Sequence, residues 1–215
     1  MASTANLVSF ALPNKGCWKR TGGWALEEVL VRHYGPYLRS KGVDLYIASG
    51  AEKRALASQF KVDGRLETDK IDVVLAGLKR GRRIPFGAVH VKASIAERRT
   101  DDVPLSDALV KAGYTSPMWT MDCKSTPAAL PMNKGEMGAA LRPGEPDKRS
   151  AKRKDVEVDG FFSACFSYNR NTIPTPAGKQ CKARIYGCDF SNVNDLFSRF
   201  IVNAWKAFAA KNNIA

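Results

Sequence analysis

The chain lacks the sequence features of membrane-spanning and secreted proteins. It contains no run of about 18 apolar residues, the length that a bilayer-spanning helix requires. No basic residue precedes the short apolar patch near its start, so a signal peptide is not expected. Its five cysteines form no Cys-x-x-Cys pair, and an odd number fits reduced thiols better than a disulfide framework. These absences predict a cytoplasmic protein without a membrane segment or structural zinc.

Acidic residues are scarce relative to basic ones. The sequence has 21 Asp and Glu against 34 Lys and Arg, which gives a net charge of +13 and a pI near 9.7. This excess predicts an acidic partner such as a nucleic acid, although ribosomal, RNA-binding and membrane-associated proteins share it. Internal repeats and linkers are also lacking, so the 215 residues are expected to form a single domain, 1–215, with a substantial core.

The sequence has no glycine-rich phosphate loop and no recognisable Ser/His/Asp arrangement, and its clearest pattern is a β-hairpin with a basic tip. Apolar runs at Ile71–Leu78 and Phe86–Ala93 flank a turn-forming segment at 79–83. Because side chains alternate faces along a strand, Asp72 and Lys92 are expected to lie at the same end of the hairpin. The pattern therefore predicts that a carboxylate and an ammonium group converge there.

This arrangement resembles the PD-(D/E)xK nucleases, and among them the type II restriction endonucleases. In that family an Asp begins one strand and the next strand carries (D/E)-x-K, so that two acids hold a divalent metal beside a lysine. Asp72 and Lys92 match the first acid and the lysine. The run Lys92–Arg98 (KASIAER) is similar to the K-(T/A)-S-(I/L)-x-E-R run of several restriction enzymes. Ile71 replaces the frequent Pro, and His90 replaces the second acid.

The resemblance implies a Mg²⁺ cofactor and a second acid from elsewhere, because His90 is a poor magnesium ligand. In some members of the family the missing acid comes from the helix after the lysine strand, where Glu97, Asp102 and Asp107 are candidates. We favour Glu97, because it lies close to the end of the strand. Glu27, on the helix ahead of the hairpin, is expected to join the metal region; an ordinary helix-surface glutamate is the alternative.

A second Asp-x-Lys, formed by Asp122 and Lys124, competes with this assignment. Its upstream acid would be Asp101 or Asp102, which are expected to cap a helix rather than to lie in a strand. The pair of Asp72 and Lys92 is therefore preferred. A lysine that extends from a sheet edge into solvent is the alternative explanation of Lys92.

Basic and polar side chains near these strands predict contacts with DNA. Arginine is suited to guanine O6 and N7 in the major groove, and Glu97 could accept a hydrogen bond from cytosine N4. Glu97-Arg98 lies about where restriction enzymes that cut at CCGG read G·C pairs. A second group lies between two later strands, although asparagine is also common in turns. The predicted DNA-binding residues are Ser94, Arg98, Arg99, Asn169, Arg170 and Asn171.

Apolar periodicity predicts the remaining elements. An irregular arm, residues 1–20, precedes a helix that is interrupted at Gly35-Pro36. Residues 125–155 are predicted to form a long loop whose basic run either binds phosphate or is solvated. The other predicted strands are Val43–Ser49, Met118–Lys124, Val156–Tyr168 and Ala183–Phe190. The other predicted helices are Glu52–Phe60, 105–112 and Leu196–Phe208.

The predicted fold is α/β, a restriction-endonuclease-like core with a mixed β-sheet flanked by helices. The predicted function is sequence-specific, Mg²⁺-dependent cleavage of double-stranded DNA in a prokaryotic cytoplasm. A homodimer is expected, because palindromic sites are read by two-fold symmetric proteins. Two alternatives remain: a non-catalytic basic DNA- or RNA-binding protein in which Asp72 and Lys92 are structural, and a repair or structure-specific nuclease of the same fold.

Overall fold

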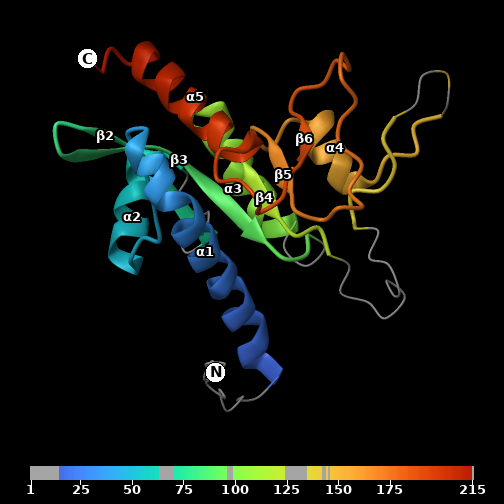
Figure 1. Ribbon diagram of the computed structural model, residues 1–215, viewed down its shortest axis with the longest axis horizontal. Helices are drawn as coiled ribbons and strands as arrows, with labels where there is room; N and C mark the ends of the chain where they lie inside the picture. Colours follow the sequence, from blue (N-terminus) through green and yellow to red (C-terminus); the bar gives the residue numbers. More distant parts are fainter. Residues whose placement is uncertain are drawn as a thin grey trace, which may run out of the picture.

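The computed structural model describes residues 15–62, 70–95, 99–123, 135–141, 144 and 146–214 (Figure 1). The helices are α1 (Lys15–Ser40), α2 (Gly50–Gln59), α3 (Arg99–Lys111), α4 (Ala151–Glu157) and α5 (Leu196–Lys211). The strands are β1 (Val43–Tyr46), β2 (Val73–Lys79), β3 (Arg82–Lys92), β4 (Met118–Thr120), β5 (Cys165–Ser167) and β6 (Ile185–Gly187). In this part of the chain, no helix is both long and apolar enough to cross a membrane.

One mixed sheet of six strands, in the order β1-β2-β3-β4-β5-β6, runs through the described residues. The first three strands are antiparallel, and β3 to β6 are parallel. Val73 pairs with Val89, and Lys92 pairs with Thr120, so the start of β2 and the ends of β3 and β4 lie at the same edge. The prediction of an α/β fold with a mixed sheet is confirmed.

The basic hairpin predicted from the sequence is present. Strands β2 and β3 are joined by a two-residue turn in which Arg80 has φ 49° and Gly81 has φ 75°. Two positive φ angles give the turn a twist that matches the right-handed twist of the flanking strands. The turn starts the pairing, and a bulge in β3 between Pro85 and Gly87, opposite Leu75 and Ala76, shifts the register before the pairs that place Asp72 and Lys92.

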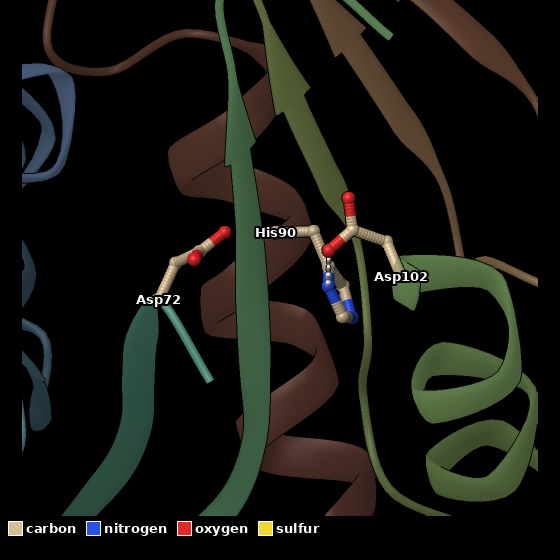
Figure 2. Close-up of side chains that lie close together, drawn as sticks. All are labelled: Asp72, His90 and Asp102. Atoms are coloured by element: carbon tan, nitrogen blue, oxygen red, sulfur yellow. Dashed lines mark ion pairs between the residues drawn. The ribbon is translucent and has the colours of Figure 1, made fainter. Parts of the chain in front are cut away.

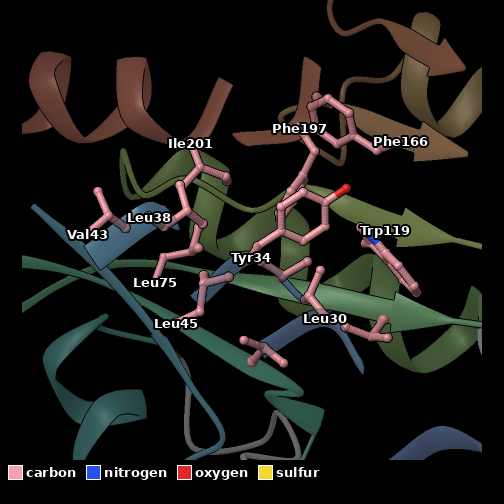
Figure 3. Packing of buried hydrophobic residues seen from close by; sticks show 14 of the residues in the cluster. Leu30, Tyr34, Leu38, Val43, Leu45, Leu75, Trp119, Phe166, Phe197 and Ile201 are labelled. Atoms are coloured by element: carbon pink, nitrogen blue, oxygen red, sulfur yellow. The ribbon is translucent and has the colours of Figure 1, made fainter. Parts of the chain in front are cut away.

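Helices cover both faces of the sheet. One face packs against α1 and α5 through a core that includes Leu30, Tyr34, Leu75, Trp119 and Phe197 (Figure 3). On the opposite face a second cluster joins α2 and α3 to the sheet; it contains Leu56, Phe60, Val74, Ala88, Leu105 and Leu109. Phe86 packs on the α1 and α5 face, but from Gly87 onward β3 alternates regularly, so the side chains of His90 and Lys92 share the α3 face with Ala88.

Helix α1 is longer than expected and runs without interruption. It begins at Lys15, so the predicted arm of residues 1–20 is wrong for its last six residues, and residues 1–14 lie outside the described part. The predicted interruption at Gly35-Pro36 is also wrong, because the helix continues to Ser40. A residue before proline normally avoids the helical region because of a clash with the proline ring. Gly35 has no Cβ to make that clash, and buried Leu38 holds the last turn on the core.

The region before β5 differs from the prediction. Residues 151–157 form α4 rather than loop and strand, and β5 extends only over Cys165–Ser167. Ser150 caps α4 by accepting a hydrogen bond from the backbone N–H of Arg153 at 3.2 Å. Arg153 and Glu157 form an ion pair of 2.7 Å one helical turn apart. These local contacts favour a helix where the apolar pattern alone resembled a strand.

Gly87 permits a close backbone approach beside the lysine strand. A Cβ at Gly87 would lie 1.9 Å from the carbonyl oxygen of Thr115, which also accepts a hydrogen bond from the N–H of Ala88 at 3.0 Å. We predict that Gly87→Ala lowers the free energy of unfolding by about 1–3 kcal/mol, because the backbone at Gly87 or at Thr115 must shift to make room for the new methyl group. Urea denaturation measures this change. Gly50→Ala, whose Cβ would meet only Arg54 at 3.9 Å, is the control. Equal stability of the two variants would contradict the prediction.

Candidate active site

Asp72 and Lys92 meet at the edge of the sheet, as the hairpin pattern predicted. The Nζ of Lys92 lies 2.7 Å from Oδ2 of Asp72, and both side chains are buried. The same Oδ2 accepts a hydrogen bond from the backbone N–H of Val91 at 2.8 Å. Because a strand N–H holds this carboxylate, its orientation is set by the hairpin itself. The predicted convergence of the two charged groups is confirmed.

A second buried acid reaches the same place from the first turn of α3. Oδ1 of Asp102 lies 3.3 Å from Nζ of Lys92, and its side chain points from α3 toward the sheet (Figure 2). Burial by itself would raise the pKa of Asp102, but the neighbouring His90 and the charge of Lys92 outweigh burial and lower it. Asp102 is therefore held as a carboxylate beside the ammonium group.

Two of the three candidates for the second acid are distinguished by position. Asp102 faces the pair, whereas Asp107 forms an ion pair of 2.6 Å with exposed Lys111 on the same helix. Glu97, which the sequence favoured, lies outside the described residues and stays a prediction. Glu27 is half-buried on α1, and its expected role in the metal region also stays a prediction.

His90 completes the cluster. Its ring is fully buried, and its Nδ1 lies 3.8 Å from Oδ1 of Asp102. On the other side of the ring, Nε2 lies 3.0 Å from Oγ of Ser116, which is 2.7 Å from Oγ of Ser106. Ligand atoms of Asp72, His90 and Asp102 lie within 4.8 Å of one another. No sequence motif marks the two serines, because they lie 10 residues apart and meet only through folding.

The donor set fits a divalent cation. Two carboxylates are sufficient for Mg²⁺, which keeps several waters of its own. Oδ1 of Asp102 is buried without a hydrogen bond, beside the ammonium group of Lys92 at 3.3 Å, so its lone pairs are available to a cation. The ammonium group of Lys92 offsets part of the negative charge of the two acids in this arrangement.

Asp122, the acid of the competing Asp-x-Lys, organises loops. It is fully buried, and its Oδ1 accepts hydrogen bonds from the N–H groups of Glu136 (2.6 Å) and Met137 (3.2 Å). Its Oδ2 accepts one from Thr172 at 2.5 Å. Burial raises the pKa of Asp122 despite these donors. Lys124 lies outside the described residues. With its oxygens directed at three loop donors, Asp122 supports a structural role.

The turn after β5 contains three predicted DNA-binding residues. The side-chain amide of Asn169 donates to the carbonyl of Asp122 at 2.9 Å, and its Oδ1 accepts from the N–H of Asn171 at 2.9 Å. Asn169 therefore shapes the turn, as asparagine does in Asx turns. Arg170 and Asn171 are exposed. Of these three, Arg170 presents the long cationic side chain that phosphate or base contacts require.

The segment that follows Lys92 is held by a residue that the sequence did not single out. Glu136 accepts hydrogen bonds from the N–H of Ile95 at 2.7 Å and from the hydroxyl of Ser94 at 3.2 Å. Lys152 lies 3.0 Å from the same carboxylate. Arg98 lies outside the described residues, and Arg99 begins α3. Glu136 was missed because it lies in a stretch that carries no motif.

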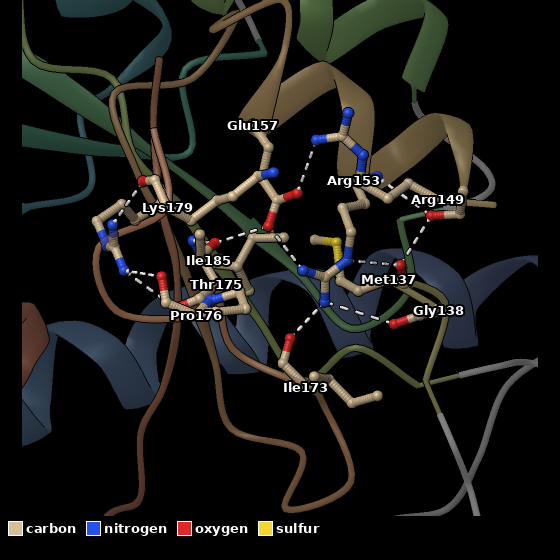
Figure 4. A network of polar contacts seen from close by, with 12 residues as sticks. Met137, Gly138, Arg149, Arg153, Glu157, Ile173, Thr175, Pro176, Lys179 and Ile185 are labelled. Carbon is tan, nitrogen blue, oxygen red and sulfur yellow. Dashed lines mark hydrogen bonds and ion pairs between the residues drawn. The ribbon is translucent and has the colours of Figure 1, made fainter. Parts of the chain in front are cut away.

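A buried arginine joins the neighbouring loops (Figure 4). Arg153 donates hydrogen bonds to the carbonyl groups of Met137 and Ile173, and it is paired with Glu157. Arg149 also contacts Glu157, at 3.2 Å. The basic run that was predicted either to bind phosphate or to be solvated is thus engaged mainly in ion pairs. Arg149, Lys152, Arg153 and Lys154 each form an ion pair with an acidic side chain, while Lys148 is exposed.

Substitution of Asp122 tests whether its carboxylate has a structural or a catalytic role. Asp122→Ala should lower the free energy of unfolding by about 2–4 kcal/mol, because buried N–H donors lose their acceptor. Asp107→Ala, which breaks an exposed ion pair with Lys111, should cost less than about 0.5 kcal/mol. Chemical denaturation measures both. If Asp122→Ala keeps wild-type stability and loses only enzymatic activity, the structural assignment is wrong.

Comparisons with known proteins agree with the fold. No family model matches the chain. It is 35% identical over 193 residues to the type II restriction enzyme AgeI of Thalassovita gelatinovora. The aligned region covers 86% of this chain and 67% of the relative.

Two solved structures are similar. A specific complex of AgeI with DNA has a TM-score of 0.78 at 34% identity and covers 88% of this chain and 69% of that one. A pre-specific complex of the restriction endonuclease BsaWI with DNA has a TM-score of 0.58 at 16% identity, covers 93% and 67%, and shows the shared fold alone. The chain belongs to the type II restriction endonucleases, enzymes that cut DNA at specific sequences.

Proposed function

We propose that the chain cuts double-stranded DNA with Mg²⁺ held by Asp72 and Asp102, and that Lys92 assists the attacking water. The observation that carries this proposal is the meeting of two buried carboxylates around one ammonium group, at 2.7 Å and 3.3 Å. Burying three charged groups is costly unless they are paired, so a function explains why all three are retained.

Each residue has a distinct role in the proposed reaction. Bound Mg²⁺ supplies an activated water and neutralises charge that develops on the phosphate. Asp72, fixed by the N–H of Val91, and Asp102, fixed on α3, orient the cation from two sides. Lys92 extends into the same space and can hydrogen-bond the water or a phosphate oxygen. The buried surroundings strengthen these interactions, because little solvent screens them.

Single substitutions test the assignment. Asp72→Ala, Lys92→Ala and Asp102→Ala should each slow magnesium-dependent cleavage at least about a thousandfold, which corresponds to about 4 kcal/mol of transition-state stabilisation. Plasmid digestion measures cleavage, and a gel shift in calcium measures binding, which should persist. Asp107→Ala, on the same helix, should cut at the wild-type rate. If Lys124→Ala abolishes cleavage and Lys92→Ala does not, the site lies elsewhere.

Digestion of a plasmid also separates the proposed function from its alternatives. Discrete magnesium-dependent fragments are expected of a sequence-specific enzyme. Intact DNA with a gel shift would indicate a binding protein, and cutting restricted to unusual DNA structures would indicate a repair nuclease. Sequencing the fragment ends would define the site that is cut.

We further propose that the segment after β3 reads the DNA. Glu97 and Arg98 would contact bases, while Arg99, Ser94 and Arg170 would contact the bases or backbone nearby. The hydrogen bonds from Ile95 and Ser94 to Glu136 support this proposal, because they fix the start of the segment. A segment anchored beside the cleavage site can couple recognition to cutting.

A homodimer on DNA is also proposed, since a palindromic site presents the same bases to two symmetric subunits. Sedimentation velocity of the protein with a duplex that contains its recognition sequence should give a complex with two chains of 23.6 kDa. Calcium in place of magnesium keeps the duplex intact during the run. A complex that holds one chain at saturating protein concentration would overturn the dimer.

A further inference from the structure

His90 has one nitrogen with a hydrogen-bond partner and one without. Its ring is fully buried and meets the ring of Phe162 edge-on, with centroids 5.5 Å apart. Nδ1 has no hydrogen bond, and neither does Oδ1 of Asp102, which lies 3.8 Å away. That distance is too long for a hydrogen bond between them. Nδ1 thus lacks a hydrogen bond of its own and faces the same carboxylate oxygen that lies 3.3 Å from Nζ of Lys92.

A pair of serines behind the ring holds its orientation. Nε2 of His90 lies 3.0 Å from Oγ of Ser116, which lies 2.7 Å from Oγ of Ser106. With Nε2 engaged on that side, Nδ1 faces the carboxylate of Asp102 on the other.

A cation between Nδ1 of His90 and Oδ1 of Asp102 would have a nitrogen donor on one side and an oxygen donor on the other. Asp72 provides a further oxygen, and all three ligand atoms lie within 4.8 Å of one another. The hydrogen bond between Nε2 and Oγ of Ser116 is the kind of second contact that orients a metal-binding histidine. The ring is thus prepared to bind a metal through Nδ1.

We propose that Nδ1 of His90 is a third donor to the cation held by Asp72 and Asp102, and that it makes the site selective for transition-metal dications such as Mn²⁺ over Mg²⁺. This inference rests on the proposed function. Imidazole suits transition metals, whereas Mg²⁺ prefers oxygen ligands. Mg²⁺ uses the two carboxylates, and Mn²⁺ gains a nitrogen ligand besides. A cation in this position replaces the contact between Lys92 and Asp102.

Electron spin-echo spectroscopy of the Mn²⁺-loaded protein tests this directly, without any measurement of cleavage. Mn²⁺ bound to imidazole shows modulation from a coordinated ¹⁴N nucleus, and labelling the wild-type chain with ¹⁵N-histidine should change that modulation. The chain has two histidines, so His33 on α1 provides a matched control. The modulation should be lost in His90→Asp, which substitutes an oxygen donor, and kept in His33→Gln.

Metal competition gives a second measurement. The ratio of Mn²⁺ to Mg²⁺ affinity should fall at least about tenfold in His90→Asp and stay unchanged in His33→Gln. One result would overturn the role of His90 and leave the proposed function intact. In that result the wild-type protein binds Mn²⁺ without modulation from histidine, and Asp72→Asn no longer binds Mn²⁺. Mn²⁺ binding that survives Asp72→Asn would overturn the proposed metal site itself. Because the labelled wild type needs no substitution, a variant that fails to fold cannot hide the result.

Discussion

The position of β3 between an antiparallel and a parallel neighbour is the constraint on which the rest of the molecule depends. Antiparallel pairing with β2 brings Asp72, just before β2, beside the end of β3. β3 pairs in parallel with β4, and β4 pairs in parallel with β5. The loops that follow these three strands therefore lie at the same edge of the sheet. A strand with two parallel neighbours would have placed the start of β2 at the opposite edge. The mixed sheet thus gathers acid, lysine and loops in one place.

The cluster at this edge brings like charges together. Asp72 and Asp102 contribute two carboxylates, and Lys92 contributes one ammonium group. These three residues and His90 are buried, with at most 6% of each residue's surface exposed. Two carboxylates buried this close together are unfavourable without positive charge beside them, and the ammonium group supplies one such charge. A dication at this position would supply more.

Around the cluster, loops are held by side chains that belong to no nuclease motif. Asp122 joins the end of β4 to the N–H groups of Glu136 and Met137, and Arg153 joins Met137 to Ile173. Glu136 in turn holds the segment after Lys92. These contacts hold Ile95 and the described loops around the cluster in place. Precise positions matter here, because a displacement of about 1 Å can strongly reduce the rate of a reaction.

The sequence by itself determined the hairpin, the meeting of Asp72 with Lys92 and the class of the fold, because alternation along paired strands is a local rule with a period of two. The choice of Asp102 over Asp107 and the approach of His90 to Asp102 were decided only by the tertiary structure. Both depend on how α3 and the segment at Ser116 pack on the sheet, contacts between residues distant in the sequence. The helix α4 also escaped prediction, because the charged residues 151–155 predict a loop and the pattern from Val156 predicts a strand, whereas the cap at Ser150 and the ion pair of Arg153 with Glu157 favour a helix.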